Sequence, residues 1–100
     1  DNKNIVIWGA GHQSLAIISL SGIASYISYI VDSADFKQNK YTSGTNIKIE
    51  SPKQLINNKP DVLIIIAAGY SDEVKRIISS KYAFIKNIAI VREDHLEIIE

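Results

Sequence analysis

The chain contains no cysteine, so disulfide bonds, thiolate zinc sites and a cysteine nucleophile are excluded within its 100 residues. The same absence is compatible with the reducing cytoplasm, where we expect the protein to be located. The longest uninterrupted apolar run, residues 62–68, is too short to span a bilayer. The formal net charge of zero gives no sign of a surface for nucleic acid or membrane, so we expect neither partner.

Methionine is also absent, even at position 1. We therefore expect a domain that was cut from a longer, multidomain protein. One hundred residues suit a single domain, residues 1–100, which would bury roughly two-thirds of the surface of its unfolded chain.

The charges are unevenly distributed although they sum to zero. Residues 35–59 hold five lysines and two acids, whereas residues 92–100 hold four acids and one arginine. Such segments are usually solvated surface, and a site for an anionic ligand near the lysines is the alternative interpretation.

Residues 4–14, Asn-Ile-Val-Ile-Trp-Gly-Ala-Gly-His-Gln-Ser, join a short apolar run to two glycines and the start of a helical pattern. An apolar run of this length is typical of a strand covered on both faces in a parallel sheet. Gly9 would permit the tight turn, and Gly11 would leave room for a ligand phosphate at the helix N-terminus. Ser14 replaces the third glycine of the dinucleotide motif, so a turn that needs glycine for geometry alone is the alternative.

Asp32 follows the second apolar segment, 21 residues after Gly11. An acid in this place holds the ribose 2′-hydroxyl in dinucleotide-binding domains. The alternative is an Asx-type turn in which Asp32 leads into Ser33. His12, in the glycine turn, is able to donate a hydrogen bond to a phosphate or to act as a general acid, although a histidine at a helix start more often contacts backbone or solvent.

The pattern of apolar residues predicts five strands, at residues 4–9, 26–31, 47–49, 62–68 and 88–91. It predicts helices at residues 12–24 and 51–59 and a third helix that Ser71 caps. Leu55 and Ile56 are expected to face the sheet, and the third strand is expected at a sheet edge. We expect a long loop over residues 33–46 and a polar tail or short helix over residues 92–100.

This order of elements predicts an α/β, Rossmann-like three-layer domain. Its sheet is expected to be mainly parallel and five-stranded, in the order 3-2-1-4-5. The carboxyl ends of the first and fourth strands would then form a ligand crevice.

The titratable side chains form no familiar catalytic set, so we predict no catalytic residue and no metal site in this chain. The two histidines, His12 and His95, have no metal-ligand spacing, and there is neither a Gly-x-Ser-x-Gly elbow nor a phosphate loop. The glycine turn also differs from that of S-adenosylmethionine sites, because Gln13 stands where a third glycine is expected and Ile7 and Trp8 stand near the place of an acid. We expect no cofactor in this domain.

Three blocks follow one another along the chain: residues 7–16 (IWGAGHQSLA), residues 31–45 (with VDS and FKQNKYTSGT) and residues 67–73 (AAGYSDE). Together they resemble the C-terminal domain of sugar C-methyltransferases that use S-adenosylmethionine. The resemblance spans nearly the whole chain and is more specific than a single glycine motif.

The resemblance implies a parent protein with an N-terminal zinc-binding module and a central methyltransferase domain that holds S-adenosylmethionine and the principal catalytic residues. The Rossmann-like C-terminal domain would help to enclose a nucleotide-linked deoxysugar. The glycine turn and the loop after the second strand would border that cleft. The expected ligand-binding residues are Gly9, Gly11, His12, Gln13, Ser14, Asp32, Lys37, Lys40, Tyr41, Gly44 and Tyr70.

We therefore expect a domain that binds or positions the sugar nucleotide beside the preceding methyltransferase domain and that is inactive when isolated. One alternative is a module that binds NAD(H) or another nucleotide through Gly9, Gly11 and Asp32. The other is a vestigial Rossmann unit that only packs against a neighbouring domain.

Overall fold

The computed structural model of the chain describes residues 3–92 and 96–99. Its helices are α1 (His12–Ser21), α2 (Gln54–Asn57) and α3 (Ser71–Lys81), with single 3₁₀ turns η1 (Ala24–Tyr26), η2 (Asp35–Lys37) and η3 (Ala68–Tyr70). Its strands are β1 (Ile5–Trp8), β2 (Ile27–Val31), β3 (Lys40–Tyr41), β4 (Lys48–Glu50), β5 (Val62–Ile65), β6 (Ile88–Val91) and β7 (Leu96–Ile99).

The strands of the described chain form one seven-stranded sheet in the order β3-β4-β2-β1-β5-β6-β7. The five central strands are parallel, and β3 and β7 pair antiparallel with them at the two edges. The sheet order changes direction at β1, because β2 pairs with one side of β1 and β5 with the other. At such a switch point the carboxyl ends of neighbouring strands leave a crevice.

The predicted order of the five parallel strands is confirmed, and the predicted number of strands is wrong. The two missed strands give weak sequence signals for different reasons. The two residues of β3 are both exposed. In β7 the apolar Leu96 and Ile98 are exposed, and Glu97 between them accepts a hydrogen bond from Arg92 Nε at 2.9 Å.

Four local predictions are also corrected. The segment expected as a tail or short helix contains β7, and the third predicted strand, β4, lies inside β3 rather than at the edge. Helix α2 has a single turn that buries Leu55 and leaves Ile56 54% exposed, since one turn offers only one inward position. Helix α1 ends at Ser21, where Gly22 adopts the left-handed conformation that terminates helices.

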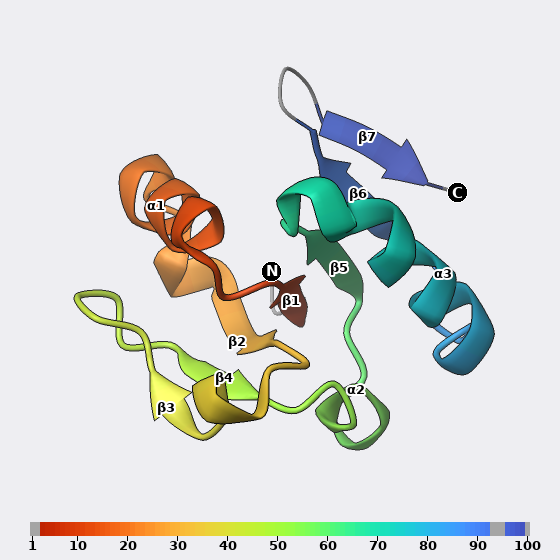
Figure 1. Cartoon of the computed structure of the whole chain (residues 1–100), viewed down its shortest axis with the longest axis horizontal. Helices are drawn as coiled ribbons and strands as arrows, with labels where there is room; N and C mark the ends of the chain where they lie inside the picture. The colour runs from red at the N-terminus through yellow and green to blue at the C-terminus, as the bar shows by residue number, and fades with distance from the viewer. Residues whose placement is uncertain (1–2, 93–95, 100) are drawn as a thin grey trace.

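Helix α1 covers one face of the sheet, and α2 and α3 cover the other (Figure 1). Because successive strand residues point to opposite faces, Val6 and Trp8 of β1 join the core under α2 and α3, and Ile7 joins the core under α1. Both cores are apolar, so the central strands are near-continuous apolar runs. The three-layer expectation is confirmed.

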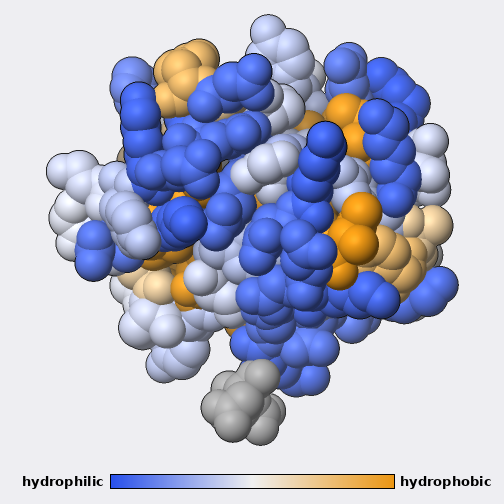
Figure 2. All heavy atoms as spheres, turned by 90° about the horizontal axis from the view of Figure 1, so that it is seen from below, coloured by the Kyte–Doolittle hydropathy of each residue, from blue (hydrophilic) through white to orange (hydrophobic). Residues whose placement is uncertain are grey.

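Hydrophilic residues cover most of the side of the molecule that is seen from below the view of Figure 1 (Figure 2). Apolar residues reach that surface in small groups between them. No helix within the described residues is long and apolar enough to cross a membrane.

The buried Tyr29 side chain of β2 links the sheet to the end of α2 by a hydrogen bond. Its hydroxyl donates a hydrogen bond to the Asn58 carbonyl at 2.5 Å and lies 3.3 Å from the Gln54 carbonyl, which also accepts the Asn58 N–H at 2.9 Å. Burial, together with the nearby Glu50 carboxylate, raises the pKa of Tyr29 from 10.0 to about 12. The neutral phenol is therefore the form that the folded state favours.

The substitution Tyr29→Phe is expected to lower the free energy of unfolding by about 1 kcal/mol at pH 8, because the hydrogen bond to Asn58 is lost. The contribution of a group whose pKa is raised on folding is complete below its unfolded pKa of 10 and disappears as the pH rises to about 12. The variant should therefore lose less stability than the wild type between pH 10 and 12. Urea unfolding across this range, with Tyr26→Phe on the exposed Tyr26 as control, measures the effect. Parallel pH profiles for wild type and Tyr29→Phe would contradict it.

Candidate functional site

The turn from β1 to α1 depends on Gly9 for its shape. Gly9 has a φ of +131°, and its N–H donates to the Val31 carbonyl of β2 at 2.8 Å. A Cβ atom there would lie 2.0 Å from the carbonyl oxygen of Ile66, just beyond β5. Any side chain at Gly9 would therefore separate β1 from the chain that leaves β5, so the fold itself requires this glycine.

Gly11 has a different environment. Its φ is −80° in the extended region, and a Cβ atom placed there would meet no other atom within 4 Å. Gly11 is the N-cap of α1, and the helix geometry leaves the N–H groups of His12, Gln13 and Ser14 without an intrahelical acceptor. The absence of a side chain at Gly11 thus leaves open space beside a helix N-terminus.

A hollow of about 390 Å³, called the first hollow below, lies at the carboxyl ends of β1, β2 and β5. This is the place where the sheet order predicts a crevice. Eight of the eleven expected ligand-binding residues line it: Gly9, Gly11, His12, Gln13, Ser14, Asp32, Lys37 and Tyr70. The remaining walls include Trp8 and the segment that follows β5.

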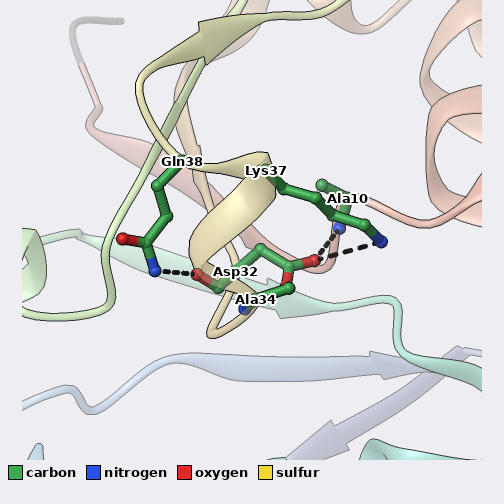
Figure 3. A network of polar contacts seen from close by, with 5 residues as sticks. All are labelled: Ala10, Asp32, Ala34, Lys37 and Gln38. Atoms are coloured by element: carbon green, nitrogen blue, oxygen red, sulfur yellow. Dashed lines mark hydrogen bonds and ion pairs between the residues drawn. The ribbon is translucent and has the colours of Figure 1, made fainter.

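The carboxylate of Asp32 joins the glycine turn to the segment that follows β2 (Figure 3). Its Oδ2 accepts the N–H of Ala10 in the glycine turn at 2.9 Å and lies 3.9 Å from Lys37 Nζ. Its Oδ1 accepts the N–H of Ala34 at 2.9 Å, which is the geometry of an Asx turn. The turn role considered from the sequence is present, and the role of Asp32 toward a ribose stays a prediction.

The backbone of Asp32 completes this network. Its carbonyl accepts a hydrogen bond from Gln38 Nε2 at 2.8 Å (Figure 3), and its N–H donates to the Glu50 carbonyl of β4 at 3.1 Å. The chain after β2 is therefore held against both the glycine turn and β4. This fixes Lys37 and its neighbours at the rim of the first hollow.

A second hollow, of about 510 Å³, lies beside the first. Lys40 and Tyr41 of β3 line it, and it shares Gly11, His12 and Lys37 with the first hollow. Ten of the eleven expected residues thus line one or both hollows. Gly44 lines neither, although its neighbour Ser43 does.

Phe36 in η2 also lines the second hollow, and the list of expected site residues omitted it. The available signal was an aromatic residue inside a polar, lysine-rich segment. Phe36 is 71% exposed, and Lys37 Nζ lies 5.7 Å from the centre of its ring. Because this exposed ring lines the second hollow, Phe36 is a further candidate for contact with a ligand.

The two helices that begin beside the first hollow differ in charge. The first turn of α3 carries Asp72 and Glu73, and Asp72 Oδ1 pairs with Arg92 Nη2 at 2.9 Å. This hydrogen bond with Arg92 is the main cause that lowers the pKa of Asp72, so its negative charge persists. The first turn of α1 has no acid, and residues 4–31 contain no Asp, Glu, Lys or Arg. An anion is therefore better accommodated at α1 than at α3.

Two serines beside these helix starts are buried and have no hydrogen-bond partner for Oγ within the described residues, namely Ser14 and Ser71. Ser14 lines the first hollow. Ser71 is the first residue of α3, whose N-cap is Tyr70, so the prediction that Ser71 caps this helix is wrong. Within residues 3–92 and 96–99, no group of three or more His, Asp or Glu side chains is placed to hold a metal ion; His95 lies outside the described residues.

The fold is that of a Rossmann-like α/β domain. It is similar to the crystal structure of UDP-D-quinovosamine 4-dehydrogenase from Vibrio fischeri, with a TM-score of 0.72 and 17% sequence identity over 98% of this chain and 93% of that one. At this identity the likeness concerns the fold alone.

The chain belongs to the family of the C-methyltransferase C-terminal domain, whose model matches residues 1–97. It is 30% identical over 88 residues to the C-methyltransferase NovU of Streptomyces niveus. The alignment covers 87% of this chain and 20% of NovU, so the chain spans about a fifth of the length of that relative. The resemblance noted from the three sequence blocks is confirmed.

The two glycines of the turn are expected to respond differently to alanine. Gly9→Ala should lower the free energy of unfolding by about 3 kcal/mol or more, because the new methyl group collides with the Ile66 carbonyl and strains φ. Gly11→Ala should cost about 1 kcal/mol or less, because only the N-cap preference changes. Urea unfolding of both variants measures this contrast, and equal losses would contradict the geometry described for the turn.

Proposed function

We propose that this domain binds the sugar-nucleotide substrate of a C-methyltransferase and holds its diphosphate at the N-terminus of α1. The observation that carries the proposal is the open space at Gly11 beside the unpaired N–H groups of α1, in a turn without acids. A diphosphate is the part of a sugar nucleotide that such N–H groups and a helix dipole favour.

The lysines beside the hollows supply the second support for an anionic ligand. Lys40 is exposed at the rim of the second hollow, and Lys37 lies between the two hollows. Lys37 balances the Asp32 carboxylate at 3.9 Å, so this acid does not repel an anion as an isolated charge would. In this role the domain acts by position: it fixes the substrate while another part of the protein transfers the methyl group.

We assign the methyl donor, S-adenosylmethionine, to a preceding domain of the parent protein, as the family implies, and zinc to its N-terminal module. The residues of this chain fit the cofactor poorly. Both carboxylate oxygens of Asp32 already accept N–H groups from Ala10 and Ala34, so a cofactor ribose would have only their remaining lone pairs. Gln13 adds a side chain to the turn where the cofactor motif has glycine. The family match, together with Ser14 in place of the third glycine of the dinucleotide motif, leads us to prefer a sugar nucleotide over NAD(H).

The lysines provide the test of the proposal. In the full-length protein, Lys40→Ala and Lys37→Ala should each weaken the binding of a sugar nucleotide by about tenfold, because a charge-assisted contact to the diphosphate is lost. Calorimetric titration at two salt concentrations measures the effect, and the wild type should lose more affinity with salt than either variant.

The matched control is Lys86→Ala. Lys86 is exposed on the chain that enters β6, so it lies at the amino ends of the parallel strands, away from the two hollows. Affinities of both rim variants equal to that of Lys86→Ala would exclude the diphosphate role of the lysines. Saturable binding of NADH that Asp32→Ala abolishes would support the alternative function.

A further inference from the structure

The two hollows adjoin at the N-terminus of α1. They share Ala10, Gly11, His12 and Lys37, so a ligand longer than either hollow is able to lie across this boundary. A diphosphate at α1 would sit at the junction. The groups attached to its two ends would then extend in opposite directions, one into each hollow.

The second hollow has the chemistry of an aromatic, cationic surface. Phe36 and Tyr41 line it and are 71% and 61% exposed. Lys37 and Lys40 also line it, and none of its described lining residues is acidic. The two rings stand on short polar elements, η2 and β3, and neither ring belongs to the two cores of the domain. Their exposure therefore has no explanation in the packing of this chain.

Of the parts of a sugar nucleotide, the base is the one that an exposed aromatic ring binds best. Every base has a flat π face that stacks on aromatic rings, and this stacking is tolerant of base identity. Lys37 Nζ lies over the ring of Phe36, whose side chain remains largely exposed to a ligand in the hollow. The hollow is also adjacent to the diphosphate position, as the short link through a ribose requires.

We propose that Phe36 and Tyr41 form a stacking site for the nucleobase of the sugar nucleotide in the second hollow. This inference rests on the proposed function, because the diphosphate at α1 determines which way the ligand extends. It follows that the sugar lies in the first hollow, near Gln13 and Tyr70. Residues 36–41 then distinguish a nucleotide-linked sugar from a free sugar phosphate.

The test compares ligands with and without a base. The full-length protein is titrated calorimetrically with pyrophosphate and with UDP, dTDP, GDP and CDP, and the tightest nucleotide is carried forward. Phe36→Ala should weaken the binding of that nucleotide about 10- to 100-fold and leave pyrophosphate affinity unchanged, because only the base loses its stacking partner. Tyr41→Ala should act in the same direction.

Matched variants separate stacking from mere apolar contact. Phe36→Trp should keep the nucleotide affinity, whereas Phe36→Leu, which retains apolar volume without a π face, should lose it as Phe36→Ala does. Since Phe36 is outside both cores, the melting temperature of each variant should equal that of the wild type.

The outcomes distinguish this inference from the function on which it rests. If neither pyrophosphate nor any nucleotide binds the wild type, the proposed function fails and the base site fails with it. If a nucleotide binds in a Lys40-dependent way but Phe36→Ala binds it as the wild type does, the function stands and the base site is overturned. A Phe36→Ala variant that melts at a lower temperature but binds the nucleotide normally would show that another domain covers the ring, and this also overturns the base site.

Discussion

The arrangement of the candidate site depends on Asp32, the residue that follows β2. Its carboxylate accepts N–H groups from two different turns. Ala10 belongs to the glycine turn after β1, and Ala34 belongs to the segment after β2. Without this acceptor both N–H groups would be left unpaired beside the hollow, which costs about 1–3 kcal/mol for each buried group. The Asp32 carboxylate also pairs with Lys37 of η2 at 3.9 Å and so holds η2 beside the two hollows. The Asp32 carboxylate therefore has a structural role: it holds the glycine turn and the segment after β2 in place beside the first hollow.

The two glycines of the turn have different roles: the fold requires Gly9, whereas Gly11 leaves space for a ligand. Gly9 lies against the Ile66 carbonyl and sets how closely β1 and the chain after β5 approach. A Cβ atom added at Gly11 would meet no atom within 4 Å, so no packing contact of the described chain requires a glycine there. In a domain that keeps only a geometric turn, a side chain at position 11 would be accommodated. Open space at an acid-free helix N-terminus, at the switch point of the sheet, is the arrangement that favours an anionic ligand.

The sequence predicts the central part of this structure because parallel strands covered on both faces must be apolar throughout, and such runs are visible in residues 5–8 and 62–65. It does not predict β3 or β7, since backbone pairing alone defines the first, and the second exposes its apolar residues Leu96 and Ile98. Ten of the eleven expected site residues line the hollows because strand order brings the ends of β1, β2 and β5 together. Phe36 was missed because exposure of a ring depends on tertiary structure, which a motif does not record.

The central claim is that the carboxyl edge of this sheet holds a nucleotide-linked sugar by its diphosphate. A crystal structure of the full-length protein with a bound sugar nucleotide tests it most directly. The account predicts the diphosphate oxygens within hydrogen-bond distance of the N–H groups of residues 12–14, with the rest of the ligand lying in the two hollows. A sugar nucleotide that binds without contact to residues 9–14 would contradict it.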